Sequence, residues 1–275
     1  MHYFFILLIA MTLCHGTWAQ DNNDEDGTTA TLPELISKTV NADPLADLAE
    51  TLAAPEIRID ALREAAISYG ARGGLAKRTE QIRESLERKS ATMDRIYDFR
   101  RLLIPAPSGL LIEPPIISEG EDATLIEAGG QSAAVADKIF NINRNARIVS
   151  TARNWRAYLE REWGEVVLPP DVLRPRTDAE KREWVEYLTR GWAEGLRQAD
   201  EVFQADLNEL VADYTGMIRY RKLLAQNIVS APYALQVDRG VTGGGDEMRV
   251  GDRAVQITGP SVLRTEAFEW QPVSR

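Results

Sequence analysis

The chain has very few side chains that can act as a thiol nucleophile or an imidazole base. Its 275 residues include one cysteine, Cys14, and two histidines, His2 and His15. Histidine is the commonest general base, and histidine and cysteine supply most zinc ligands. All three residues lie in a stretch that has the features of an export signal. The predicted mature protein therefore has no disulfide and no zinc site of this type, so packing must supply its stability.

The N-terminal segment also lacks charge. Residues 1–19 contain no Asp, Glu, Lys or Arg, and Phe4–Leu13 is an apolar run as long as a secretory signal core but short for a membrane span. Small residues ending at Ala19 fit a signal-peptidase site, which predicts a signal peptide over residues 1–19. The alternative is lipidation of Cys14, although Leu13 stands where a lipoprotein signal has a small residue.

Beyond residue 19 the chain is acidic and ordinary in its apolar content. The formal net charge of −10 lies wholly in this part, which argues against direct nucleic-acid binding because such binding needs a basic surface. Residues 20–31 are rich in acidic and small side chains and are predicted to be a disordered linker. We expect residues 32–275 to form one α+β domain, predominantly helical, with two long helices and a small C-terminal antiparallel β region.

Apolar residues recur at helical spacing in two long segments. The first runs from about Glu56 to Leu103 and ends before Pro105. The second begins at Thr177, where Thr177 and Glu180 have the spacing of a capping box, and continues to about Ala225. A shorter helix pair is predicted over residues 32–52, and one short helix around Asn154–Leu159.

Other segments favour extended structure. Leu110–Ile117 (LLIEPPII) predicts an edge strand around Pro114 and Pro115, whereas Ala123–Val149 fits strand or helix, with a turn at Gly129 and Gly130. In the C-terminal part we expect three short strands, Tyr233–Thr242, Met248–Val250 and Val255–Thr258, with turns at residues 243–245 and 251–252. The glycine-rich segment 240–245 lacks the lysine of a phosphate-binding loop, so a hairpin loop is favoured there.

Both long helices carry small residues four positions apart. Such stripes let two helix backbones approach closely, which predicts that the two helices cross at these residues; alternatively, each stripe faces a bulky neighbour. The residues are Ala66, Gly70 and Gly74 in the first helix and Gly191, Gly195 and Ala199 in the second.

Tryptophans and carboxylates leave two further hypotheses open. Tryptophans could line a sugar or peptide cleft, but helical spacing favours packing in a core or an interface; they are Trp155, Trp163, Trp184, Trp192 and Trp270. Glu183 and Glu186 lie three residues apart and could share a helix face, as a glycan-cleaving enzyme would need, although surface helices often have this spacing.

Several segments together resemble the DotC/TraI family of type IVB secretion and conjugation systems, related to the Dot/Icm apparatus. The similar segments follow one another in consistent order over most of the predicted mature chain: Ala61–Leu75, Leu110–Ile117, Asn154–Leu159, Gly191–Phe203, Leu207–Met217 and Gly240–Met248.

The resemblance implies an envelope protein without enzymatic activity that works with DotD-like and DotH-like partners in the outer-membrane part of a secretion channel. It implies no catalytic, cofactor-binding or metal-binding residue. Familiar members of the family are lipoproteins, and Leu13 departs from that pattern, which leaves attachment through partners as the simpler alternative. We expect Pro114, Pro115, Phe268 and Trp270 to contact partners. A periplasmic protein that binds or cleaves peptidoglycan and an adaptor in another envelope machine are the competing hypotheses.

Overall fold

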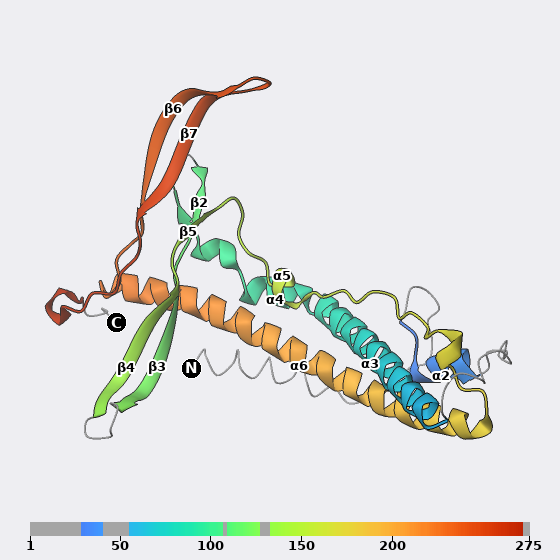
Figure 1. Cartoon of the computed structure of the whole chain (residues 1–275). Helices are drawn as coiled ribbons and strands as arrows, with labels where there is room; N and C mark the ends of the chain where they lie inside the picture. The colour runs from blue at the N-terminus through green and yellow to red at the C-terminus, as the bar shows by residue number, and fades with distance from the viewer. Residues whose placement is uncertain (1–28, 41–54, 107–108, 127–132, 272–275) are drawn as a thin grey trace.

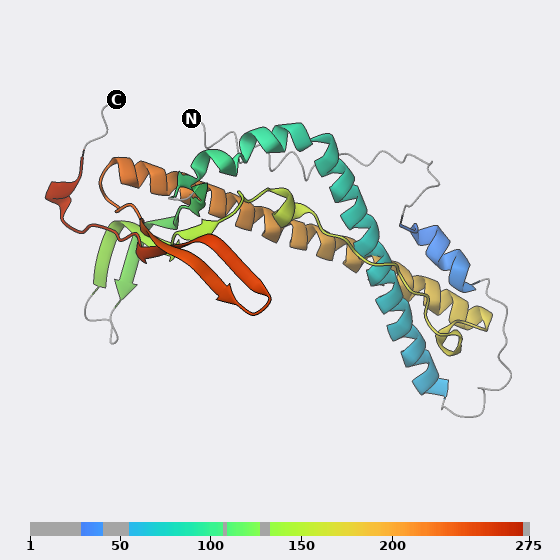
Figure 2. The same cartoon turned by 90° about the horizontal axis from the view of Figure 1, so that it is seen from above.

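One helix, α6 (Asp178–Ala225), runs through the molecule and contacts most of its other parts (Figures 1 and 2). The computed structural model describes residues 29–40, 55–106, 109–126 and 133–271. The 48 residues of α6 span about 72 Å at about 1.5 Å per residue. Its start is the predicted capping box, because the Thr177 hydroxyl accepts from the Glu180 amide and the Glu180 carboxylate accepts from the Thr177 amide. The helix continues without a break through its three glycines.

The second long helix is α3 (Pro55–Arg88), which runs parallel to α6 and crosses it (Figure 2). It is shorter than the sequence predicts. Helical geometry stops at Lys89, where φ is −105° and ψ is 5°, and α4 (Ser90–Ile96) continues in a new direction, followed by the 3-10 helix η1 (Phe99–Leu102). Apolar spacing is preserved across this bend, so periodicity alone did not reveal it.

The N-terminal helix α2 (Leu32–Val40) packs against the start of α3 and α6. The Trp184 indole nitrogen donates to the buried Thr39 hydroxyl at 2.9 Å. The rest of the predicted helix pair, the signal peptide, Cys14 and the Gly129–Gly130 turn lie outside the described residues.

The segment between the long helices forms an antiparallel ribbon that crosses α6. Its upper part pairs β2 (Leu111–Glu113) with β5 (Arg147–Val149), and β1 (Ile104–Pro105) adds to β2. Its lower part is a hairpin of β3 (Ile116–Ile126) and β4 (Ala133–Arg144). The described residues of this span, 123–126 and 133–149, are thus largely extended, which resolves the ambiguity left by their pattern. The ribbon is followed by α5 (Arg156–Leu159) and the 3-10 helix η3 (Asp171–Leu173).

The C-terminal part forms one long hairpin rather than three short strands. Strand β6 (Tyr233–Gly244) pairs with β7 (Glu247–Gly259), and the two-residue turn Gly245–Asp246 joins them. The turn predicted at residues 251–252 is wrong. Gly251 has φ 72° and lies at an irregularity in the register, so the backbone bulges there and the strand continues. The 3-10 helix η4 (Ala267–Glu269) follows. An α+β fold with two long helices and a C-terminal antiparallel sheet is confirmed.

The apolar core is distributed along α6 in three clusters. The start of α6 packs with α2 and α3 around Trp184, its middle and later turns pack with α4, η1, α5 and the end of α3 around Leu210, and its last turns pack with β3 around Tyr220. Successive lengths of the same helix are thus covered by different sets of neighbours.

The α3 and α6 backbones are in contact where they cross. A Cβ atom on Gly70 would lie 2.2 Å from the Leu188 carbonyl oxygen, and one on Gly195 would lie 2.0 Å from that of Ala71. Neither backbone atom can move away at low cost, so these positions require glycine.

The other members of the two stripes lie along the same crossing. Cβ atoms on Gly74 and Gly191 would each lie 2.2 Å from a carbonyl oxygen of the facing helix. Ala66 and Ala199 are buried at 0% and 3% exposure.

We expect Gly70→Leu and Gly195→Leu each to destabilise the protein by about 3 kcal/mol or more, because a side chain there must separate two backbones. The melting temperature should fall by roughly 6–12 °C in calorimetry. Gly164→Ala is the control, since a Cβ at Gly164 meets nothing within 4 Å. Unchanged melting of both leucine variants would contradict the close crossing.

Candidate functional site

The two hairpins project from opposite sides of α6 and present apolar side chains to solvent (Figure 1). On the β6–β7 hairpin, the exposed apolar residues are Tyr233, Leu235, Val237, Val241, Met248 and Val250. A two-stranded hairpin without covering structure is at best marginally stable in water. Such a hairpin is therefore a candidate surface for a partner.

Three of these side chains share one face near the end of the hairpin. Val241 pairs directly with Val250, and Met248 precedes Val250 by two residues, so alternation places all three on the same side. Their exposed fractions are 62%, 74% and 73%, respectively. We call Val241, Met248 and Val250 the distal apolar face.

Among the described side chains of the β3–β4 hairpin, Val135 is 72% exposed and Ile139 is 39% exposed. Arg219 of α6 also contacts the base of this hairpin: it donates to the Ile117 carbonyl at 2.6 Å and to Glu119 at 3.0 Å.

A second candidate surface lies after the C-terminal hairpin. Phe268 in η4 is 83% exposed and Trp270 is 44% exposed. The segment is nevertheless held in place, because the Trp270 indole donates to the Arg264 carbonyl and Asn227 donates to the Glu269 carbonyl at 2.7 Å. Two of the four predicted contact residues thus lie at the surface.

The other two predicted contact residues, Pro114 and Pro115, are buried within the chain. They connect β2 to β3 where the ribbon passes α6, and Ile116, directly after them, packs against α6. A Cβ atom on Gly216 would lie 2.6 Å from an Ile116 methyl group, so the lack of a side chain at Gly216 leaves room for the ribbon to pack against α6. We therefore do not carry the two prolines forward as contact residues.

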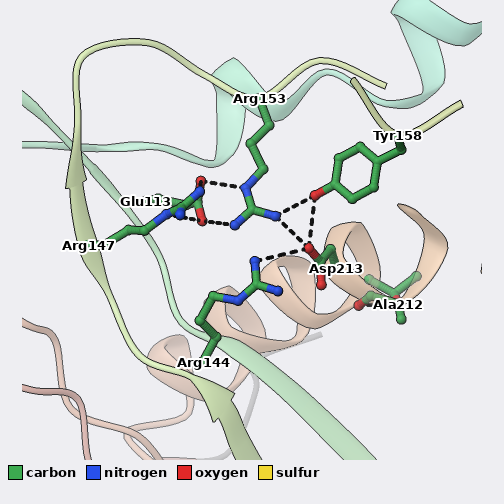
Figure 3. A network of polar contacts seen from close by, with 8 residues as sticks. Glu113, Arg144, Arg147, Arg153, Tyr158, Ala212 and Asp213 are labelled. Carbon is green, nitrogen blue, oxygen red and sulfur yellow. Dashed lines mark hydrogen bonds and ion pairs between the residues drawn. The ribbon is translucent and has the colours of Figure 1, made fainter. Parts of the chain in front are cut away.

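A buried polar network joins the ribbon to α6 (Figure 3). The Glu113 side chain at the end of β2 is 3% exposed and accepts two hydrogen bonds from Arg147 and two from Arg153. Arg153 also donates to Asp213 of α6 at 2.6 Å. Asp213 is 7% exposed and accepts from the Tyr158 hydroxyl at 2.8 Å and from Arg144 at 3.3 Å.

Burial and hydrogen bonding both shift pKa values in this network. Burial would lower the pKa of Arg153, but its hydrogen bonds to Glu113 and Tyr158 raise it above the usual range. Burial raises the pKa of Tyr158 to about 12, and its hydrogen bond to Asp213 acts in the same direction. The network therefore keeps a charged guanidinium and a protonated phenol together at neutral pH.

Sequence reasoning missed this network, although one signal was present. Asp213 stands three residues after Leu210 and four before Met217, within the apolar stripe of α6. A charged residue in such a stripe requires a buried partner. Nothing in the spacing identified Arg153 as that partner, because it comes from a distant irregular segment.

The environments of Glu183 and Glu186, the carboxylates considered for catalysis, differ from that of a general acid. Glu183 accepts from Arg63 at 2.8 Å, and this hydrogen bond lowers the pKa of Glu183, whereas a general acid needs a raised one. Glu186 is exposed on α6. Trp155 and Trp184 do not share a cleft, since they are buried in different core clusters.

Over the described ranges, no helix is both long and apolar enough to cross a membrane. Within the same residues, no group of three or more acidic, histidine or cysteine side chains is arranged to hold a metal ion.

Comparison with known protein families identifies the class of protein to which the chain belongs. Residues 56–272, which include both long helices and both hairpins, match a family described as type IV secretory system, conjugal DNA-protein transfer. The protein is thus a component of a type IV secretion or conjugation system. It belongs to the TraI family, in agreement with the resemblance to DotC/TraI proteins. A search of curated proteins finds no match.

We expect Arg153→Met to destabilise the protein by about 3–5 kcal/mol, because it removes the cation that two buried carboxylates share. Urea unfolding measures this loss. Arg197→Met is the control, since the ion pairs of Arg197 with Glu194 and Glu201 are exposed and are screened by solvent. Equal stability of the two variants would contradict a structural role for the network.

Stability should also fall at alkaline pH. The pKa of Tyr158 is about 12 in the folded protein, above its usual value near 10, so folding favours the protonated phenol. This contribution is complete below pH about 10 and is lost as the pH rises towards about 12. Calorimetry across this range should show a smaller decline for Tyr158→Phe. In Tyr158→Phe the melting temperature should still fall with rising pH, but less steeply than in the wild type, because burial also raises the pKa of Tyr97 and Tyr220. An unchanged slope would contradict the assignment.

Proposed function

We propose that this protein is a non-enzymatic assembly component of a type IVB secretion or conjugation apparatus in the bacterial envelope, which helps to place channel subunits at the outer membrane. The observation that supports this most is the distal apolar face on a hairpin that projects from a helical body. Burying about 100 Å² of apolar surface contributes roughly 2.5 kcal/mol, so a few such side chains can support docking. In this proposal residues 32–275 act as one domain.

The proposed partners are DotD-like and DotH-like channel subunits. The protein reaches the periplasm through a signal peptide cleaved after Ala19 and stays at the outer membrane by association with these subunits, without direct contact to nucleic acid. Acylation of Cys14 is the alternative mode of attachment.

The distal apolar face can be tested with the triple variant Val241→Ser, Met248→Ser and Val250→Ser. We expect affinity capture of DotH-like and DotD-like subunits from envelope extracts to fall at least roughly tenfold, the equivalent of about 1.4 kcal/mol. The melting temperature should stay unchanged, since none of the three side chains belongs to a core cluster. Val167→Ser, at 66% exposure and outside both hairpins, is the matched control. Undiminished capture by the triple variant would contradict the proposal.

The aromatic C-terminal surface needs its own variants. Phe268→Ala alone removes the most exposed side chain, whereas Trp270→Ala also removes the hydrogen bond to Arg264. In the proposal, Phe268→Ala weakens capture without changing the fold. Capture at the wild-type level would exclude this surface from the interface.

Two further measurements separate the alternatives. Mass spectrometry of the mature N-terminus distinguishes a Gln20 start from an acylated Cys14. A turnover assay on peptidoglycan tests the glycan-cleaving alternative, which requires activity that Glu183→Gln or Glu186→Gln abolishes.

A further inference from the structure

The bases of the two hairpins lie close together, at the point where the ribbon passes α6. β2 leads into β3 through Pro114 and Pro115, and β4 leads into β5 through Asn145 and Ala146, so both strands of the ribbon are interrupted side by side. In Figure 1 the ribbon changes direction there as it passes α6.

The base of the C-terminal hairpin is tied to this same interruption. The Asn145 amide nitrogen donates to the Ser261 carbonyl, and the Ser261 amide donates to the Asn145 side-chain oxygen, both at 3.1 Å. Ser261 follows the end of β7 by two residues and is 1% exposed. The ribbon and the second hairpin therefore share an attachment point.

Charged side chains hold both sides of the interruption. Arg144, at the last position of the β3–β4 hairpin, bonds Asp213 of α6, whereas Arg147, at the first position of β5, bonds Glu113. Arg153 lies between the Glu113 and Asp213 carboxylates and contacts both, as Figure 3 shows.

We propose that Glu113, Arg144, Asn145, Arg153 and Asp213 form a joint that sets the direction of the β3–β4 hairpin relative to α6 and to the β6–β7 hairpin. Apolar contacts resist separation but tolerate rotation, whereas paired guanidinium and carboxylate groups also constrain orientation. Arg144 belongs to the hairpin itself and lies at the edge of the buried network, since its side chain is 42% exposed and it contacts Asp213 at 3.3 Å.

The existence of the joint does not depend on the proposed function, but its use in docking rests on that proposal. If each hairpin docks on a partner, the joint holds the two surfaces at a set angle, so that both partners can bind at once.

Spin-label distance measurements on the full chain test the joint. Cys14 is the only native cysteine, so a Cys14→Ser background gives unique labelling sites. Labels at exposed positions Asp137, Gln204 and Asp246 report on the β3–β4 hairpin, α6 and the tip of the β6–β7 hairpin.

In Arg144→Met, we expect the distance distribution between positions 137 and 204 to become roughly twice as broad, because motion of the hairpin on the microsecond-to-millisecond timescale is frozen out as static disorder. The distribution between positions 204 and 246 should stay at its wild-type width. Arg197→Met, which removes exposed ion pairs within α6, should change neither. A wild-type width between positions 137 and 204 in Arg144→Met would overturn the joint.

A second pair of variants distinguishes loss of the joint from general destabilisation of the protein. Asp213→Asn weakens every contact of the joint to α6, whereas Leu210→Ala opens a cavity one turn away in the buried stripe. Broadening in Asp213→Asn but not in Leu210→Ala supports the joint, and equal broadening in both contradicts it. If the distances respond as expected but capture of both partners by Arg144→Met equals the wild type, the joint stands and its proposed use in docking fails.

Discussion

The structure depends on the buried stripe of α6. This single face packs in succession against α2 and α3, against α4, η1 and α5, and against the ribbon. A long helix presents one continuous face, but each packed neighbour covers only part of it. The core is therefore elongated, and among the described residues no second layer packs against the strands that leave it. The projecting hairpins follow from this shape.

Two close contacts along α6 set where its neighbours cross. Glycines place the α3 backbone against α6 near Gly195, and Gly216 admits the ribbon near Ile116. Between them, Asp213 replaces an apolar residue in the stripe and connects to Arg153. Apolar packing thus supplies most of the association, while glycines and one charged residue specify position and direction.

The proposed assembly role in a type IV secretion system rests on this arrangement. The apolar side chains of the β6–β7 hairpin are presented far from the core, and the carboxylates considered for catalysis are exposed or held by arginine. The family match, over residues 56–272, covers the helices and the hairpins together.

The sequence by itself determined the α+β class, both long helices, the capping box at Thr177 and the glycines of the crossing. These features depend on local periodicity and hydrogen-bonding capacity, which the chain carries at each position. Tertiary structure decided the bend at Lys89, the continuation of β7 through Gly251, the burial of Pro114 and Pro115, and the pairing of Arg153 with Glu113 and Asp213. Each of these depends on contacts between segments far apart in the chain, and local pattern contains no information on which distant segment is the partner.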